Sequence, residues 1–317
     1  MDGSAVLPNF LIIGAEKAAT TWLARCLAEH PSVFLPPEKE IFFFSSRFGR
    51  GRGWYASHFR DWSGEPRVGE ATPVYLGHPD APERIRATLG EIDLIVSLRH
   101  PVDRAYSAYW HNLRQGRLSP GSDFTRCLEA DTLEIRSRGE YVPHLLRYLR
   151  LFPRERLLVL LYDDIQDEPA QALRRCLEFL HVDPGFRPST LEMRLNEGGA
   201  DLTAATGPVR RLRSALRSGY LWARRRNLIP RALERRLVAG ADQTARRAAA
   251  LGPRTREYES LAPTLRAELL DRYYWVESDR LEELLGVDLS RWGVARPRPS
   301  NAAPVPAAAL RGRSRSA

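Results

Sequence analysis

Short apolar runs that alternate with amphipathic stretches constrain the fold of this chain more than any other feature. Residues 10–13 read Phe-Leu-Ile-Ile and 157–161 read Leu-Leu-Val-Leu-Leu without a polar break, and 92–98 are mainly apolar, with Asp93 and Ser97 as the exceptions. Continuous apolar runs of this length are typical of strands that are buried on both faces of a parallel sheet. In the segments between these runs, apolar residues recur at helical spacing. The sequence therefore predicts an α/β fold with a central parallel sheet flanked by helices.

The predicted elements follow from the same patterns. Strands are expected at 10–13, 33–35, 68–72, 92–98 and 157–161. Helices are expected at 21–29, 82–89, 101–115, 141–151, 168–180 and 261–285. The segment 36–44 is predicted to be a polar turn that runs into an aromatic strand or extended segment.

The charge of the chain is concentrated in two places. The formal net charge is +9, but Pro208 to Arg247 contributes +10 and the tail 295–317 contributes +5, so the remainder carries −6. Global basicity is therefore poor evidence for a nucleic-acid partner, and we expect none. The mostly helical segment 208–247 could be an amphipathic cover, an acceptor lid or a contact with anionic lipid.

Composition also predicts domain organisation and location. A single domain is expected over 1–294, followed by a disordered basic Pro/Ala tail over 295–317. The apolar run at 7–14 is too short for a signal peptide and lacks a basic lead-in, and no run approaches the ~20 apolar residues of a membrane span. These features predict a cytoplasmic protein.

Lysine is almost absent, and its two occurrences point to a site. Of 48 Lys and Arg residues only Lys17 and Lys39 are lysine, so each indicates a place that needs a compact ammonium. Lys17 follows the 10–13 strand, and Thr20 and Thr21 begin the next helix. Unpaired N–H groups at a helix start, two hydroxyls and an ammonium together suit a phosphate or a sulfate.

The spacing around Lys17 is not that of a nucleotide-triphosphate loop. That loop reads G-x-x-x-x-G-K-[ST], whereas here no glycine precedes Lys17 at the required distance. The 92–98 strand ends in Arg99, where an aspartate would be needed to bind magnesium. A monophosphate bound by cations and backbone, without metal, is favoured over a triphosphate with Mg²⁺.

Residues 16–23, Glu-Lys-Ala-Ala-Thr-Thr-Trp-Leu, resemble the 5′-phosphosulfate loop of sulfotransferases that use 3′-phosphoadenosine 5′-phosphosulfate (PAPS). They are most similar to the heparan-sulfate-type and bacterial branch, in which the loop usually reads Lys-x-Gly-Thr-Thr or Lys-Gly-Gly-Thr. Ala19 stands in the usual glycine position, and alanine tolerates a positive φ less well, so a tighter or less competent loop is expected. The resemblance implies a P-loop-NTPase-like sulfotransferase fold. It assigns to cofactor binding the residues Lys17, Ala18, Ala19, Thr20, Thr21 and Trp22.

Residues 94–109 resemble the 3′-phosphate motif of the same family, Arg-x-Pro-x-x-Arg-Ala-x-Ser-x-Tyr. By this resemblance Arg99 and Ser107 bind the 3′-phosphate, Arg99 through a bidentate fork and Ser107 through its hydroxyl. For Arg104, an ion pair and a ligand contact both remain open.

Glu40 is the candidate general base. The segment 38–44 matches the family's Lys-Glu-x-x-Phe-Phe, whose glutamate is the base in heparan-type enzymes. An aromatic wall beside Glu40 would desolvate the carboxylate and raise its pKa toward working pH. Glu38 is the rival base, and Lys39 is expected to assist binding or to be exposed.

The segment 70–75 resembles one that lies beside the acceptor cleft. Heparan-type members often have a lysine where this chain has Ala71, which favours a smaller or less anionic acceptor. Weaker similarity marks 138–141, a cofactor-closing loop at 196–199 and the ending at 279–292.

The resemblance implies transfer of a sulfuryl group from PAPS to a hydroxyl of a carbohydrate, lipid or small-molecule acceptor. Lys17 and Glu40 would be catalytic, and no metal would be required. A nucleotide-phosphate kinase on a related fold and a non-enzymatic basic interaction protein are the alternatives. The missing glycine spacing and the missing magnesium aspartate count against the kinase.

Overall fold

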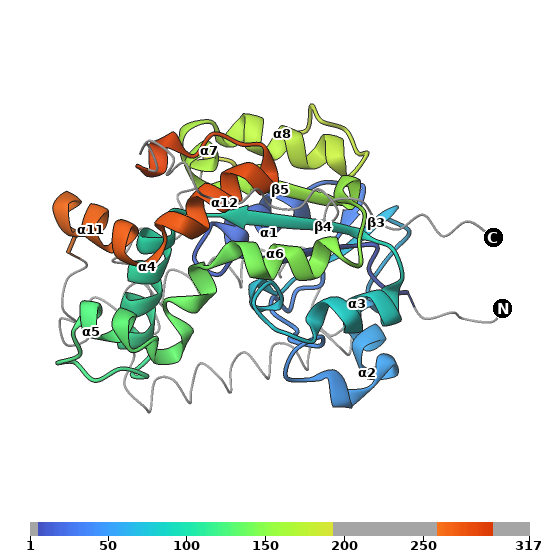
Figure 1. Ribbon diagram of the computed structural model, residues 1–317. Helices are drawn as coiled ribbons and strands as arrows, with labels where there is room; N and C mark the ends of the chain where they lie inside the picture. The colour runs from blue at the N-terminus through green and yellow to red at the C-terminus, as the bar shows by residue number, and fades with distance from the viewer. Residues whose placement is uncertain (1–5, 193–258, 294–317) are drawn as a thin grey trace, which may run out of the picture. The chain divides into compact units, whose positions relative to one another are not determined.

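The computed structural model describes residues 6–192 and 259–293, and these contain a five-stranded parallel sheet (Figure 1). Its strands are β1 (Phe10–Gly14), β2 (Val33–Phe34), β3 (Arg67–Ala71), β4 (Asp93–Leu98) and β5 (Leu157–Leu161). They lie in the order β2-β3-β1-β4-β5, and all paired strands are parallel. The predicted α/β class and the five predicted strands are confirmed.

Helices connect the strands, and most of them were predicted. The described helices are α1 (Thr20–Ala28), α2 (Arg52–Ala56), α3 (Ala81–Leu89), α4 (Pro101–Arg114), α5 (Phe124–Glu129), α6 (Tyr141–Leu149), α7 (Tyr162–Asp167), α8 (Pro169–Phe179), α11 (Pro263–Tyr273) and α12 (Trp275–Leu285). The helical region predicted over 261–285 is formed by two helices, because Tyr274 leaves the helical conformation at φ −130°. The strand considered for 36–44 is not formed. Sequence patterns did not predict α2, α5 or α7.

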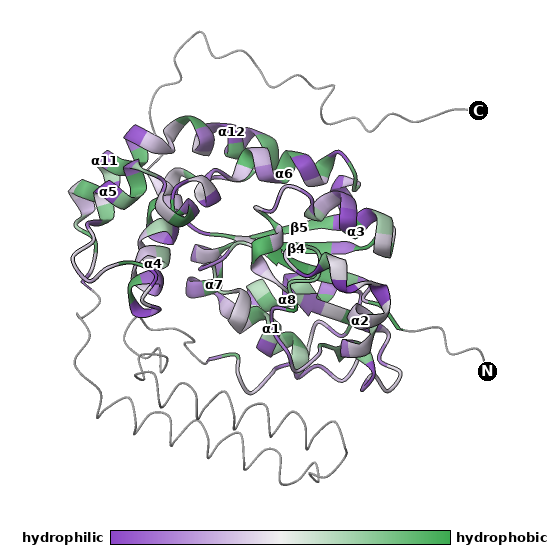
Figure 2. Ribbon diagram, turned by 90° about the horizontal axis from the view of Figure 1, so that it is seen from below, coloured by the Kyte–Doolittle hydropathy of each residue, from purple (hydrophilic) through white to green (hydrophobic). Residues whose placement is uncertain are grey.

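The sheet has a core on each face because side chains alternate along its strands. Leu11 and Ile13 pack in a core with side chains of α3, α6 and α12, whereas Phe10 and Ile12 pack in a core with α1 and α8. Figure 2 shows α6 and α12 on one side of β4 and β5, and α1 and α8 on the other. Gly69 on β3 is required beside Phe10, since a Cβ there would lie 2.1 Å from the Phe10 ring.

Contacts divide the chain into two units. The sheet and the helices named in the two cores belong to the unit formed by 1–108, 125–195 and 261–317. The other unit comprises 109–124 and 196–260, and of it the structure describes 109–124 and two residues before 261. There, Tyr109 donates a hydrogen bond to the Ser122 carbonyl at 2.7 Å and its ring lies against Phe124.

Several predictions concern parts of the chain outside the described residues. The arginine-rich segment 208–247, the loop 196–199 and the tail 295–317 lie there, so their roles stay predictions. The single domain over 1–294 and the cytoplasmic location also stay predictions. Within the described ranges, none of the helices has the length and apolar character to cross a membrane.

The sheet order places one loop between two strand ends. β1 is paired with β3 on one side and with β4 on the other, while the chain leaves β1 through α1 to reach β2 at the edge beyond β3. In open α/β sheets, ligands bind at such a switch point, beyond the carboxyl ends of the strands. The residues that follow β1, β3 and β4 are those of the Lys17 loop, the Thr72 segment and Arg99.

Candidate active site

The loop between β1 and α1 uses two left-handed residues. Lys17 has φ 69° and Ala19 has φ 62° with ψ 14°, in the conformation for which glycine is best suited. Ala18 between them is fully buried, and the Ala15 N–H donates to the Ser97 carbonyl of β4 at 2.7 Å. The loop is therefore tied to the neighbouring strand, and Ala19 takes the conformation that its place in the motif predicted.

The start of α1 presents backbone donors to this loop. The N–H of Leu23 donates to the Ala19 carbonyl at 3.1 Å, so those of Thr20, Thr21 and Trp22 precede the helical ladder. The Trp22 side chain has a separate role: it is 5% exposed, and its indole N–H donates to the Leu191 carbonyl at 3.1 Å. The Trp22 ring anchors the helix, and only its backbone N–H is directed toward an anion at the loop.

Arg99, at the end of β4, joins the second motif to the first. Its Nη1 donates to the Lys17 carbonyl at 3.2 Å, and its guanidinium lies 4.4 Å from the centroid of the Tyr162 ring. The Tyr141 hydroxyl donates to the Arg99 carbonyl at 2.8 Å and fixes the backbone there. Two cationic residues that are 82 positions apart in sequence thus meet at one loop. Ser107 lies half-buried on α4, and it makes no side-chain hydrogen bond among the described residues.

Lys39 contacts the start of α1 directly. Its ammonium donates to Thr21 Oγ1 at 2.7 Å and lies 3.1 Å from Glu40 Oε1. The 38–40 segment is therefore next to the phosphosulfate-type loop, as the base assignment requires. The expectation that Lys39 is merely accessory understated its position, because the ammonium bridges a predicted cofactor residue and the predicted base.

Glu40 is a more open carboxylate than the sequence suggested. Its side chain is 40% exposed, whereas the Phe43 and Phe44 rings are buried and pack against Tyr55 in the core. The expected aromatic wall beside Glu40 is thus not formed by these two rings. Its rival Glu38 lies 2.7 Å from His58 Nδ1, so an ion pair is formed whenever that imidazole is protonated.

A second ion pair closes the loop from the other side. Arg138 pairs with Glu16, which directly precedes Lys17, and with Glu134 at 2.7 Å. Burial lowers the pKa of the Arg138 guanidinium. Sequence patterns did not predict this contact, because Glu16 and Arg138 are 122 positions apart.

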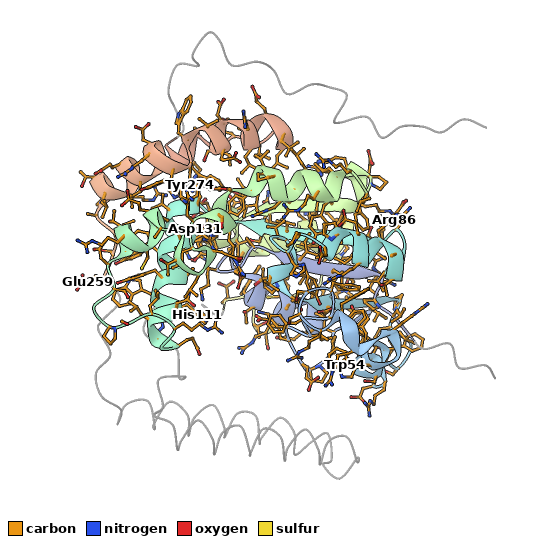
Figure 3. The ribbon with its side chains drawn as sticks, turned by 60° about the horizontal axis from the view of Figure 1, so that its bottom comes forward. Trp54, Arg86, His111, Asp131, Glu259 and Tyr274 are labelled. Carbon is orange, nitrogen blue, oxygen red and sulfur yellow. The ribbon has the colours of Figure 1, made fainter. Side chains whose placement is uncertain are left out.

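Arg104 is a buried structural residue. It is 1% exposed and donates to the Ile135 carbonyl, and it has no carboxylate partner among the described residues. The 131–139 segment that receives it lies under the junction of α11 and α12, where the Tyr274 hydroxyl donates to the Arg136 carbonyl at 3.0 Å. Figure 3 shows Asp131 beside Tyr274 at this junction.

Residues from the C-terminal part of the described chain also contact the start of α4, the helix that follows Arg99. Buried His100 makes a 3.1 Å hydrogen bond to the Trp292 carbonyl, and burial lowers the pKa of its imidazole to about 4. Asp103 forms a forked ion pair with Arg266 on α11 at 2.9–3.1 Å. These contacts hold the backbone that follows Arg99 in place at the end of β4.

A group of three or more metal-ligating side chains was not found in the described part of the chain. The functional groups of the site are the cations of Lys17, Lys39 and Arg99, the N–H groups at the start of α1 and the carboxylate of Glu40. They suit an anionic ligand with a phosphate or sulfate group at the Lys17 loop.

Comparison with known proteins identifies the family. The family model described as "Sulfotransferase domain" matches residues 7–192, more than half of the chain. The chain belongs to the sulfotransferase family. A solved structure of a sulfotransferase from Alicyclobacillus acidocaldarius is 27% identical and superimposes with a TM-score of 0.63, covering 91% of this chain and 99% of the other. The resemblance stated from the sequence is confirmed.

Curated relatives match over shorter stretches. Membrane-associated sulfotransferase kil1 of Dictyostelium discoideum is 39% identical over 142 residues, which are 42% of this chain and 30% of that protein. Heparan sulfate glucosamine 3-O-sulfotransferase 3A1 of Mus musculus is 33% identical over 192 residues, 56% of this chain and 47% of that protein. The chain thus spans about a third to a half of the length of these two relatives.

Proposed function

We propose that this sulfotransferase takes PAPS as its donor. The observation that carries the proposal is the hydrogen bond from Arg99 to the Lys17 carbonyl, because it brings two cationic motifs onto one loop. Lys17, Thr20, Thr21 and the N–H groups at the start of α1 would bind the 5′-phosphosulfate. Arg99, with Ser107 on the following helix, would bind the 3′-phosphate. The two motifs resemble the family's 5′-phosphosulfate and 3′-phosphate motifs, which supports a ligand with two phosphate groups.

The proposed reaction needs a base and a stabilised leaving group. Glu40 accepts the proton of the acceptor hydroxyl while the acceptor oxygen attacks sulfur. The bond from sulfur to the bridging oxygen of the 5′-phosphate breaks, and adenosine 3′,5′-bisphosphate leaves with that electron pair. Lys17 and the start of α1 stabilise the charge that develops on the leaving phosphate. In this scheme, side chains and backbone N–H groups of the chain stabilise the charge on the leaving phosphate.

We infer that the acceptor is a glycan. Heparan sulfate enzymes are among the relatives, and the glycan in their names is the support for this class. Ala71 argued for a less anionic acceptor, but it is 4% exposed at the end of β3, where its carbonyl accepts the Glu40 N–H. Its identity therefore says little about the surface that an acceptor would meet. Lipid and small-molecule hydroxyls are the competing acceptors.

Calorimetry tests the donor. Titration with adenosine 3′,5′-bisphosphate, in the absence of Mg²⁺, should give micromolar or tighter binding that Arg99→Met weakens at least tenfold. Arg86→Met is the matched control, because Arg86 is an exposed arginine on α3 whose carboxylate neighbour lies 3.9 Å away. If the bisphosphate does not bind, or binds only with Mg²⁺, the donor assignment is wrong and the kinase alternative gains support.

Turnover tests the base and the acceptor. With ³⁵S-labelled donor, a panel of a glucosamine-containing polysaccharide, a neutral polysaccharide, a glycolipid and simple phenols should show label in the glycans. Glu40→Gln should keep bisphosphate binding and lose turnover. Normal turnover in that variant would refute the role of Glu40 while leaving the donor assignment intact.

A further inference from the structure

Glu70 is a buried carboxylate at the end of β3, next to the candidate site. It is 1% exposed and accepts three side-chain hydrogen bonds, from the hydroxyls of Tyr55 at 2.6 Å, Thr72 at 2.5 Å and Tyr75 at 2.8 Å. Burial is the largest influence on this group and raises the pKa of the carboxyl.

The bonds around Glu70 hold the segment that contains the candidate base. Glu40 donates its N–H to the Ala71 carbonyl at the end of β3 at 3.1 Å. Phe42 donates its N–H to Thr72 Oγ1 at 3.5 Å and Phe44 to the Tyr75 hydroxyl at 3.3 Å, and these two hydroxyls in turn donate to the Glu70 carboxylate. The backbone of the segment is unfavourable by itself. Its residues at positions 40 and 42 have φ values of 65° and 59°, in the left-handed region that non-glycine residues rarely adopt.

A carboxylate is an expensive way to fill a core position. Removing its charge from water costs free energy that an apolar side chain would not incur. Asp93, the buried carboxylate at the start of β4, is compensated by the guanidinium groups of Arg67 and Arg156. Glu70 has no cationic partner among the described residues and relies on hydroxyl donors. What this arrangement provides, and a hydrophobic residue could not, is an acceptor that fixes the hydroxyls of Thr72 and Tyr75, to which the segment 42–44 donates its backbone N–H groups.

We propose that Glu70 is a positioning residue that holds the Lys39–Glu40 pair against the start of α1. It fixes the left-handed turn at Glu40, which lets the Lys39 ammonium reach Thr21 and directs the Glu40 carboxylate to the same place. The inference rests on the proposed function for its catalytic consequence. Its structural part, that the carboxylate of Glu70 maintains the 39–42 turn, stands without it.

The decisive variant is Glu70→Gln, which retains the size of the side chain. Hydrogen exchange of the amides of residues 40–42 should accelerate at least tenfold in this variant. Turnover number should fall at least tenfold, while the Kd for adenosine 3′,5′-bisphosphate stays within threefold, because the Lys17 loop and Arg99 do not contact Glu70. The matched control is Asp93→Asn, which removes a second buried carboxylate, at the first residue of β4 and paired with Arg67 and Arg156, and should leave turnover within twofold.

Two further variants keep the test informative if Glu70→Gln does not fold. Thr72→Val and Tyr55→Phe each remove one donor to the carboxylate, and each should cause a smaller fall in turnover with the same pattern of exchange. In a double-mutant cycle, Glu70→Gln should cost less in the Lys39→Met background than alone, since both act through the same contact. Full additivity would overturn the proposal.

The outcomes separate this inference from the proposed function. Unchanged exchange at 40–42 together with unchanged turnover in Glu70→Gln would overturn the positioning role even if the chain transfers sulfuryl groups as proposed. Loss of bisphosphate binding equal to the loss of turnover would also overturn it, because that indicates general collapse of the site. If Glu40→Gln retains full turnover, the base assignment fails, whereas accelerated exchange in Glu70→Gln would still support the structural part.

Discussion

Replacement of Lys39 by methionine tests whether the second lysine contributes to transfer. Methionine retains the length of the side chain and removes the charge. The ammonium of Lys39 lies 2.7 Å from Thr21 Oγ1 and 3.1 Å from Glu40 Oε1, with 29% of the side chain exposed. The exposed ion pair with Glu40 should contribute no more than about 1 kcal/mol to stability. The free energy of unfolding of Lys39→Met should therefore differ little from that of the unmodified chain.

The effect on transfer should be larger than the effect on stability. The Lys39 ammonium orders the Thr21 hydroxyl, which we assign to the donor phosphosulfate, and with the donor bound a hydrogen bond from this hydroxyl to the charged group contributes about 1.5–3 kcal/mol. Each 1.4 kcal/mol corresponds to tenfold, so kcat/KM for the donor should fall roughly 10- to 150-fold. Because Lys39 is partly exposed, the lower half of this range is expected.

The assay is the initial rate of label transfer from ³⁵S-labelled donor at varied donor concentration, with urea unfolding on the same samples. Arg50→Met is the control, because it removes one positive charge from an exposed side chain that stacks on Trp54 at 5.3 Å. It should change kcat/KM less than threefold. A value for Lys39→Met within twofold of the unmodified chain would refute the reasoning, as would an equal loss in Arg50→Met.

Three other predictions address the loop and the dependence on pH. Lys17→Arg should be nearly as damaging to turnover as Lys17→Ala, because a planar guanidinium crowds a loop built for a compact ammonium; near-normal turnover in the arginine variant would contradict this. Ala19→Gly should raise the free energy of unfolding by about 1 kcal/mol, since φ is 62° at this position, and chemical denaturation would show a decrease if the φ argument is wrong. Burial and the neighbouring Arg147 lower the pKa of His144 from 6.5 to about 4, so between these values the unfolded chain binds a proton that the folded chain does not. The free energy of unfolding should therefore fall as pH is lowered through this window. Between pH 7 and pH 5, His144→Gln should reduce this fall by about 2 kcal/mol. Parallel curves of unfolding free energy against pH for the two chains would exclude His144 as a cause.

The sequence was sufficient for features that a few neighbouring residues determine. Local apolar patterns predict the strands and most of the helices. For α4, Pro101 marks the first turn, and Gly116, at φ 67°, follows the end of the helix. The fold class followed because alternating strands and helices have few ways to pack. The position of Ala19 in the motif even predicted its positive φ.

Features that depend on contacts between distant segments were not accessible in this way. The pairing of Glu16 with Arg138 joins residues 122 positions apart, and no periodicity or local motif encodes it. The three consecutive aromatic residues that include Phe43 and Phe44 led us to consider a strand for this segment. Phe43 and Phe44 instead follow a left-handed turn into the core, because the end of β3 offers acceptors to the backbone before them.

The two lysines illustrate how a compositional observation can be correct and still be used too narrowly. Scarcity of lysine pointed to a requirement for an ammonium at both Lys17 and Lys39, but only Lys17 stands in a motif that predicts its role. In the structure, Lys39 places its charge on Thr21, four residues after Lys17, so both lysines of the chain belong to one site. The geometry at Lys39 also explains why arginine has not replaced it. One compact charge serves two oxygens, those of Thr21 and Glu40, whereas a guanidinium fork presents parallel donors in one plane. Lys17 in the loop before α1 and Lys39 on Thr21 thus bring both lysines of the chain to the start of one helix.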